Sequence, residues 1–325
     1  MTSNTRSRFT IWSATSPSLC ACLLLVPAGL FSGSVAWGQD KSGLQRTFAT
    51  AGEAAMTLGA AYQEGDLKSV ADILGDKGWR LVFSGDPVID RHERAWFLSL
   101  YREGHEVVAE SASRAVLQLG NDEQPYPIPM VKRGKRWRFD PSEGHEDLLS
   151  RRMRKAELSA VNVVLAYVEA QREYHQQDRK GDGVVEYAQK LKSTPGQHDG
   201  LFWEGQPGKA AGPLADLAAV AGEEGYRGVR VGDLPIYRGY AYKVLTAQGP
   251  RAPGGTRDYL VGGRMTEGFA LVAFPLRYGV SGVLAFLVNQ DGVIYQKDLG
   301  PKTVDLGQQM THFDPDQTWT KGQAH

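Results

Sequence analysis

The stretch Asp178–Glu186 (DRKGDGVVE) contains the residues whose types and spacing best match a metal-binding loop. Calcium loops place oxygen ligands at alternate positions of a tight turn, and a glycine at the sixth position permits the bend. Asp178 fits the first position, Asp182 the fifth, Gly183 the sixth and Glu186 the ninth. The hypothesis from this spacing is that Asp178, Asp182 and Glu186 bind calcium.

The same stretch departs from the calcium pattern at two ligand positions. Lys180 stands at the third position, where an oxygen ligand belongs, and Gln189 stands where a bidentate Glu belongs. The alternative interpretation is a helix end followed by a turn, in which Gly181 and Gly183 provide the left-handed backbone conformations. Both interpretations stay open at the level of the sequence.

No complete catalytic motif is present. His92, His105 and His145 are each followed by Glu, but none has the second His four residues on that a zinc-binding helix requires. Ser281 is one residue out of register for a serine-hydrolase elbow and leads into a predicted strand. The glycine-rich stretches also lack the Lys-Ser/Thr of a phosphate loop.

An enzyme site assembled from distant residues is the second hypothesis. Such a site needs no local motif, because the fold brings its side chains together. The polar residues that the sequence offers for it are Asp86, Asp90, His92, Asp258 and His312.

A long amphipathic helix is predicted from about Glu143 to Gln177, directly before the acidic loop. Apolar residues recur there at steps of three and four, which is the spacing of one helix face. An apolar stripe of this length needs a sheet or another helix to cover it. Three apolar, β-prone stretches that follow can provide the sheet: Tyr240–Ala247, Gly268–Phe274 and Gly282–Val288.

The order of helix-like and strand-like stretches before Pro141 predicts a smaller unit in which helices precede antiparallel strands. Helices are expected at 48–62, 67–74 and 90–101, and strands at Trp79–Phe83, 106–110, 115–119 and 130–139. This order is similar to the cone-shaped helix-and-curved-sheet arrangement of nuclear-transport-factor-2-like proteins. We therefore expect an α+β fold with a signal peptide at 1–38, a small α+β domain at 39–141, and a long-helix and antiparallel-sheet domain at 142–325.

The first 38 residues have the features of a cleavable secretory signal. Arg6 and Arg8 precede an apolar run of about 13 residues, too short for a membrane span, and small residues follow it. Cleavage would remove Cys20 and Cys22, so the mature chain would form no disulfide. The expected location is the bacterial periplasm, with no stable membrane span after cleavage.

The charge balance argues against nucleic acid as a partner. The chain has 37 basic and 37 acidic residues, and loss of the signal would leave 35 basic residues against the same 37 acidic ones. The basic clusters at 132–138 and 151–155 fit solvated faces of a hairpin and a helix, since acidic residues flank the second. The partner is expected to be an envelope protein or a ligand of unknown identity.

Several long stretches resemble the uncharacterised bacterial family known as domain of unknown function 2950. They lie in order along 48–319 and include GDKGWRLVFSGDPVID, AYVEAQREYHQQDRKGDGVVEY and VSGVLAFLVNQDGVIYQKDL. The resemblance implies an envelope protein but brings no activity, catalytic residue or cofactor.

The region from Leu148 onward is also similar to the headgroups of type IV pilins. The shared layout is a long helix, a loop with Asp-x-x-Gly-Asp-Gly and then antiparallel strands. The present helix is internal and charged at its start, whereas a pilin carries an apolar helix at its extreme N-terminus. The sequence therefore favours a non-enzymatic binding or assembly module with a pilin-like C-terminal half, and enzymatic activity is left undecided.

Overall fold

The computed structural model describes residues 45–142, 145–205 and 211–322. The predicted signal peptide at 1–38 lies outside these ranges. Within them, no helix combines the length and the apolar character that crossing a bilayer requires. The described chain contains both helices and antiparallel sheets, so the fold is α+β, as the sequence predicts.

Three helices open the described chain, and local capping sets their ends. At the start of the first helix, the Thr50 hydroxyl accepts a hydrogen bond from the backbone of Glu53, and the Glu53 carboxylate accepts one from the backbone of Ala49. Gly65 ends that helix in the left-handed conformation. The three helices are α1 (Ala51–Glu64), α2 (Leu67–Val82) and α3 (Pro87–Glu103).

The strand predicted at Trp79–Phe83 is wrong, because Trp79 to Val82 form the last turn of α2. Gly75 has φ 68° and kinks the helix after Leu74, where the sequence predicts a helix end. Tertiary contacts outweigh the β-propensity beyond this kink: Trp79 stacks on Phe83 with ring centroids 4.4 Å apart, and Arg152 donates hydrogen bonds to carbonyls of the last turn.

A five-stranded antiparallel sheet follows α3, in the order β1-β2-β4-β5 with β3 paired to β2. Residues of β2 alternate between buried and half-buried positions, which is the pattern of a sheet with one face on a core. The predicted hairpin across Met130–Phe139 is confirmed. The strands are β1 (His105–Ser111), β2 (Arg114–Leu119), β3 (Gln124–Pro125), β4 (Met130–Arg133) and β5 (Arg136–Phe139).

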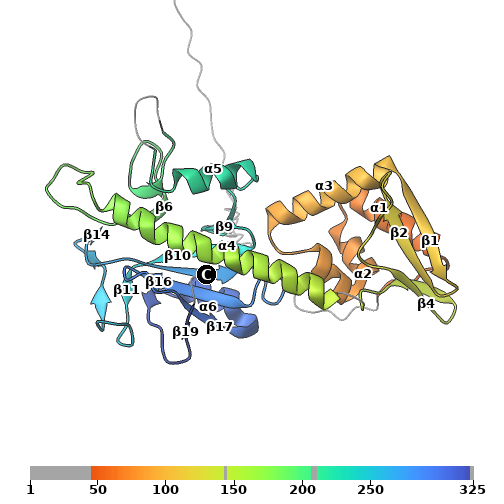
Figure 1. The fold of residues 1–325 in the computed structure, drawn as a ribbon. Coiled ribbons are helices and arrows are strands. Elements are labelled where there is room, and N and C mark those ends of the chain that lie inside the picture. Colours follow the sequence, from red (N-terminus) through yellow and green to blue (C-terminus); the bar gives the residue numbers. More distant parts are fainter. Residues whose placement is uncertain (1–44, 143–144, 206–210, 323–325) are drawn as a thin grey trace, which may run out of the picture. The chain divides into compact units, whose positions relative to one another are not determined.

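The predicted long helix is α4 (His145–Tyr174), and it packs on the sheet that follows it in the sequence. Its buried face includes Ala160, Val164 and Tyr167 at the predicted spacing of three and four residues. The Tyr167 hydroxyl donates a hydrogen bond to the Ala270 carbonyl of the sheet, at 3.2 Å. Figure 1 shows α4 as the long green helix beside strands β10 and β16.

The sheet under α4 has seven strands in the order β19-β17-β16-β15-β10-β9-β8, and its pairs are antiparallel. Its strands are β8 (Arg230–Val231), β9 (Leu234–Tyr237), β10 (Tyr240–Leu245), β15 (Ala270–Pro275), β16 (Leu284–Asn289), β17 (Tyr295–Asp298) and β19 (Thr320–Lys321). All six residues of β15 are buried, because α4 contacts the sheet on one side and α6 (Thr303–Gln309) contacts β15 as well.

Short elements complete the C-terminal part. They are β6 (Lys190–Lys192), β7 (Gly200–Phe202), α5 (Ala215–Glu223), β11 (Ala247–Gln248), β12 (Arg257–Asp258), β13 (Leu260–Val261), β14 (Arg264–Met265), the 3₁₀ turn Gly300–Lys302 and β18 (His312–Phe313).

The buried apolar residues form two clusters. One lies among α1, α2, the first sheet and the C-terminal half of α3, and the other between α4 and the seven-stranded sheet. Helix α3 contributes Val88 to the second cluster and Phe97 and Tyr101 to the first. The predicted domain boundary near Pro141 stays a prediction.

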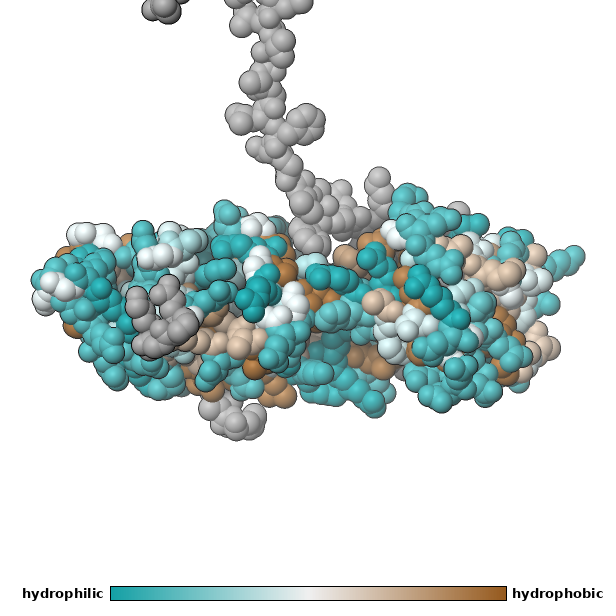
Figure 2. Space-filling model, turned by 90° about the horizontal axis from the view of Figure 1, so that it is seen from above, coloured by the Kyte–Doolittle hydropathy of each residue, from teal (hydrophilic) through white to brown (hydrophobic). Residues whose placement is uncertain are grey.

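Hydrophilic residues predominate on the face that Figure 2 shows, and hydrophobic residues appear between them in small groups. This is the usual surface of a water-exposed chain.

Candidate functional site

A largely apolar cavity of about 460 Å³ lies beside α4 and α5. Its volume lies within the range of small-molecule sites, roughly 300–1,000 Å³. Seven elements contribute to its wall: α4, β6, β7, α5, β9, β10 and β15. The larger apolar residues of the wall are Val163, Phe202, Trp203, Leu217, Ile236 and Leu271.

Helix α5 forms one side of the cavity with small residues. Ala215, Ala218, Ala221 and Gly222 line the space, so this wall has few side-chain atoms that could fill it. The helix itself has no fully buried residue. The hollow therefore follows from the alanine-rich composition of α5, placed opposite the larger side chains of α4.

Besides Tyr167 of α4, three tyrosines line the cavity and give its wall a polar component: Tyr226, Tyr237 and Tyr242. Each is at most 9% exposed. Burial raises the pKa of all three hydroxyls above the ordinary value of 10, so they stay neutral phenols. The neighbouring Asp86 carboxylate raises the pKa of Tyr226 and Tyr242 further, because it disfavours a second negative charge.

The Asp86 carboxylate is fully buried and accepts four hydrogen bonds. One oxygen caps α3 by accepting from the backbone of Val88 and Ile89, at 2.9 and 3.3 Å. The other accepts from the Tyr226 hydroxyl at 2.9 Å and from the Gly239 backbone at 2.7 Å. Asp86 therefore joins the start of α3 to the cavity wall, and its lone pairs are used within the chain.

A two-residue turn between β9 and β10 presents the Gly239 backbone to Asp86. Both turn residues have positive φ, 46° at Arg238 and 86° at Gly239, which is the geometry of a tight hairpin turn. The Arg238 guanidinium forms a two-point ion pair with Glu224 at the end of α5, and this pair holds the unfavourable arginine conformation.

The Tyr242 hydroxyl differs from that of Tyr226. Its oxygen is buried and has no hydrogen-bond partner among the described residues. A buried hydroxyl without a partner destabilises a fold by roughly 1–3 kcal/mol. Two tyrosines in one cavity wall are therefore in opposite states, one bonded to a carboxylate and one unbonded.

Exposed charges lie at other positions of the cavity wall. Arg227 and Glu204 form an ion pair of 2.9 Å, and both side chains are more than 70% exposed. Lys192 is exposed as well. These groups are solvated, whereas the tyrosines are not.

The five dispersed polar residues of the enzyme hypothesis fall into separate groups. Asp86 and Asp90 lie together at the start of α3, where Asp90 accepts hydrogen bonds from the backbone and hydroxyl of Ser84. Burial, more than the nearby Asp86, raises the pKa of Asp90. His92 lies further along α3, beside Gly225.

Asp258 and His312 belong to a different, three-stranded sheet, in which both pair with Ala247 from opposite sides. Both residues are exposed. The structure thus gathers Asp86 and Asp90 from the hypothesised set and connects Asp86 to the cavity through Tyr226. The sequence offers no local motif for this connection, because its partners are 140 and 153 residues apart in the chain.

The acidic loop starts after α4 and leads into β6 without a second helix. The Asp178 carboxylate accepts hydrogen bonds from the backbone of Lys180, Gly181 and Gly183, at 2.7–3.1 Å. The Gly183 bond contributes most to lowering the pKa of Asp178. Gly181 and Gly183 have φ of 69° and 83°, as the turn interpretation requires.

Arg264 from β14 binds the other two carboxylates of the loop. Its guanidinium pairs with Asp182 at 2.7 Å and with Glu186 at 3.3 Å. This hydrogen bond lowers the pKa of Asp182. Lys180 adds a second cation on Glu186, at 2.6 Å. Within the described ranges, no three His, Asp or Glu side chains group so as to hold a metal ion. The calcium hypothesis for Asp178, Asp182 and Glu186 stays a prediction.

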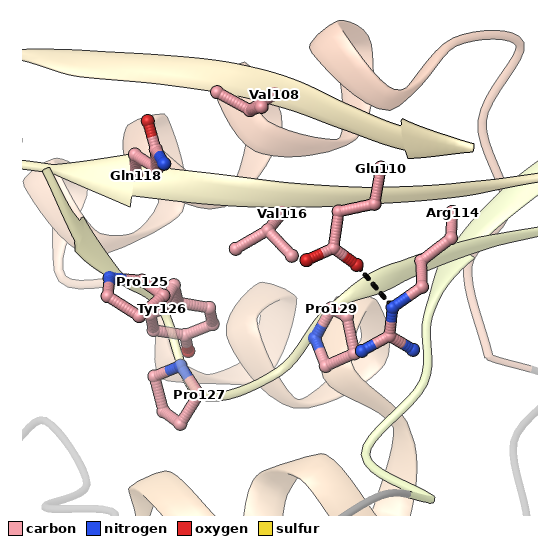
Figure 3. Close-up of a pocket in the computed structure, with 9 residues that line it drawn as sticks. All are labelled: Val108, Glu110, Arg114, Val116, Gln118, Pro125, Tyr126, Pro127 and Pro129. Atoms are coloured by element: carbon pink, nitrogen blue, oxygen red, sulfur yellow. Dashed lines mark hydrogen bonds and ion pairs between the residues drawn. The ribbon is translucent and has the colours of Figure 1, made fainter.

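A second hollow, of about 500 Å³, lies over the outer face of β1 and β2 (Figure 3). Val108 and Val116 face it from the two strands, and an ion pair between Glu110 and Arg114 closes one end. The segment that holds Pro125, Tyr126, Pro127 and Pro129 borders its other side. A larger share of its wall is polar than in the cavity beside α5, so it is the weaker candidate for a small apolar ligand.

Comparison with known proteins gives one match. No curated protein and no solved structure matches the chain. The family described as "Protein of unknown function (DUF2950)" matches residues 45–321, which is most of the chain. The seven-stranded sheet, α4 and the cavity all lie inside this matched range. The chain therefore belongs to the DUF2950 family.

Proposed function

We propose that this protein is a binding module whose cavity beside α4 and α5 takes a small, largely apolar molecule. The observation that carries the proposal is the cavity itself: about 460 Å³, with aromatic and aliphatic walls that include four buried tyrosines. An apolar molecule gains roughly 25 cal/mol for each Å² of apolar surface that it removes from water. A cavity of this size accommodates a ligand of two fused or linked rings.

Binding without chemistry fits the arrangement better than catalysis does. The tyrosine hydroxyls are held neutral by burial, and the Asp86 carboxylate uses its lone pairs within the chain. A general base needs a free lone pair within reach of a substrate proton. We therefore favour the non-enzymatic alternative of the two that the sequence leaves open.

The location of this activity is part of the proposal. An apolar ligand and a signal peptide at 1–38 together suggest that the protein binds its ligand in the periplasm. Mass measurement of the protein purified from the bacterial envelope tests this, because a chain that starts near residue 39 is expected. A chain that retains residues 1–38 contradicts cleavage.

The test of binding uses the neutral fluorophore N-phenyl-1-naphthylamine, whose emission rises in apolar surroundings. We expect saturable binding to the purified protein. Ala218→Phe places a ring in the cavity and should weaken binding on the order of tenfold or more. The matched control is Val220→Phe, because Val220 is 47% exposed on the same helix and does not line the cavity.

Two outcomes contradict the proposal: no saturable binding to the wild-type protein, or equal binding by both variants. Thermal unfolding of each variant shows whether Ala218→Phe still folds. If it does not fold, competition between the fluorophore and 2-acetylnaphthalene is measured on the wild-type protein. Mutual displacement is expected, since a single cavity binds one of the two molecules at a time.

A further inference from the structure

The unbonded Tyr242 hydroxyl indicates which kind of chemical group a ligand of the cavity carries. Tyr242 lines the cavity, is 3% exposed, and its hydroxyl oxygen has no partner among the described residues. Most buried polar groups in folded proteins have a hydrogen-bond partner, and an unbonded one therefore needs a physical reason. A partner supplied by the bound molecule is such a reason.

A comparison with Tyr226 shows that burial in this cavity wall does not by itself leave a tyrosine hydroxyl without a partner. Tyr226 lines the same cavity and donates its hydrogen bond to Asp86 at 2.9 Å. Asp86 also accepts from Gly239, Val88 and Ile89, so both its oxygens are already engaged. Tyr242 is thus left without a protein acceptor, because the nearby Asp86 carboxylate already accepts hydrogen bonds from other donors at both oxygens.

The ligand group that meets Tyr242 should be a hydrogen-bond acceptor. The lone pairs of a phenolic oxygen are partly delocalised into the ring, so the strongest bond a neutral tyrosine makes is the one it donates. Burial keeps this hydroxyl protonated, because it raises the pKa of Tyr242 far above neutral pH. The hydroxyl therefore keeps its proton over the whole physiological range.

The same group should also be neutral. The buried Asp86 carboxylate acts electrostatically on Tyr242, and an anionic ligand group placed there would be repelled by it. A carboxylate would in addition lose its hydration without gaining an ion-pair partner, because Lys192 and Arg227 are exposed to solvent and the nearby Arg238 is already paired with Glu224.

We infer that the cavity selects neutral molecules with an apolar body and one acceptor group, such as an aryl ketone, and that the Tyr242 hydroxyl donates the hydrogen bond that recognises the acceptor. Tyr242 is on this view the residue that sets specificity, while the apolar walls set affinity. The inference rests on the proposed function, since it names the ligand class of the same cavity.

The test compares three probes of nearly equal size: 2-acetylnaphthalene, its hydrocarbon isostere 2-isopropenylnaphthalene, and 2-naphthoate. Calorimetry or fluorophore displacement gives their dissociation constants. We expect the ketone to bind the wild-type protein about three- to tenfold more tightly than the isostere, the range of one net hydrogen bond. We expect the carboxylate to bind more weakly than both.

Tyr242→Phe removes only the hydroxyl, and it should abolish the preference for the ketone while leaving the affinity for the isostere unchanged. The matched variant is Tyr226→Phe, whose hydroxyl is already bonded to Asp86 and which should keep the preference. Because the Tyr242 hydroxyl is unbonded, we expect Tyr242→Phe to fold with at least the stability of the wild-type protein.

The outcomes separate the two proposals. If the wild-type protein binds none of the neutral probes, the proposed function is contradicted and the inference is lost with it. If ketone and isostere bind equally, or if Tyr242→Phe weakens both alike, the cavity binds apolar molecules but the assignment of Tyr242 is overturned. Tightest binding of 2-naphthoate likewise overturns the neutral ligand class.

Discussion

The acidic loop and the cavity wall differ in whether their polar side chains have partners within the chain. In the loop, Arg264 and Lys180 pair with the carboxylates, and backbone amides bind Asp178. In the wall, the Tyr242 hydroxyl is buried and unbonded among the described residues. The three carboxylates of the loop have their partners within the chain, whereas the Tyr242 hydroxyl of the wall has none among the described residues.

This difference shows why a motif in sequence and a site in structure can diverge. The loop carries the strongest local pattern in the chain, yet its partner Arg264 comes 78 residues after Glu186 and no spacing rule anticipates it. The cavity has no local pattern, because its wall comes from six elements between α4 and β10 together with Leu271 of β15. The candidate site is recognised from the packing that leaves the cavity and from the unbonded Tyr242 hydroxyl in its wall, rather than from clustered polar residues.

The largest effect is expected from Asp86→Ala, which leaves four donors without their acceptor. Three are backbone amides and one is the Tyr226 hydroxyl. We expect the free energy of unfolding to fall by about 3–5 kcal/mol in urea denaturation, since a buried charged acceptor is lost. Asp86→Asn keeps one acceptor oxygen and should lose less. A fall below about 1 kcal/mol contradicts the central role of Asp86.

Removing the cation of the loop tests whether its carboxylates depend on it. Arg264→Met leaves the Glu186 side chain, which is 8% exposed, with Lys180 as its remaining cation. We expect a lower midpoint of urea unfolding, because the buried Glu186 loses one of its two cations. Arg230→Met on an exposed strand is the control and should change stability by less than about 0.5 kcal/mol. If the two substitutions have equal effects, the carboxylates of the loop do not depend on Arg264, and the loop no longer differs from the cavity wall in this respect.

The two tyrosines of the wall give the most direct comparison. Tyr226→Phe should lower the free energy of unfolding by about 1–2 kcal/mol, because a buried carboxylate loses a donor. Tyr242→Phe should leave it unchanged or raise it, because no bond is lost. Thermal and urea unfolding of both variants measure this. Equal destabilisation by both means that Tyr242 has a partner within the chain.

Alkaline pH should destabilise the folded protein through its buried tyrosines. The pKa of Tyr242 is raised on folding, so its contribution to stability is complete below pH 10 and is lost as pH rises toward the folded pKa. At pH 11 each such tyrosine lowers stability by about 1 kcal/mol. Urea unfolding between pH 8 and 11 should therefore give a shallower decline in Tyr242→Phe than in the wild-type protein.

The smallest effect is expected from calcium. A calcium ion at Asp178, Asp182 and Glu186 must displace Arg264 and Lys180, so we expect a dissociation constant in the millimolar range and a stabilisation of about 0.4 kcal/mol at that concentration. Arg264→Met should bind calcium more tightly. Calorimetry with no heat for either protein contradicts the calcium hypothesis.

Periodicity in the sequence predicts the large elements of this fold well. The stripe of Ala160, Val164 and Tyr167 predicts α4, and the β-prone stretches around β10, β15 and β16 predict the sheet beneath it. Local patterns fail at Trp79–Phe83, where the β-propensity of the residues is outweighed by the contacts of α2 with Arg152.

The candidate site is predicted only in part. Asp86 stands out in the sequence as a polar residue, but its bond to Tyr226 depends on how the chain returns after 140 residues. The cavity depends on a difference in side-chain size between α4 and α5, which emerges only when the helices are packed. Contacts over such separations leave no periodic trace in a single sequence.

The position of α3 has a consequence for folding. Its first turn packs with Val88 in one core, while Phe97 and Tyr101 belong to the other. A helix shared in this way couples the two cores, because neither can lose its packing without exposing part of α3. Cooperative melting as a single transition follows, and hydrogen exchange should report one common opening energy at Leu58 and Val164.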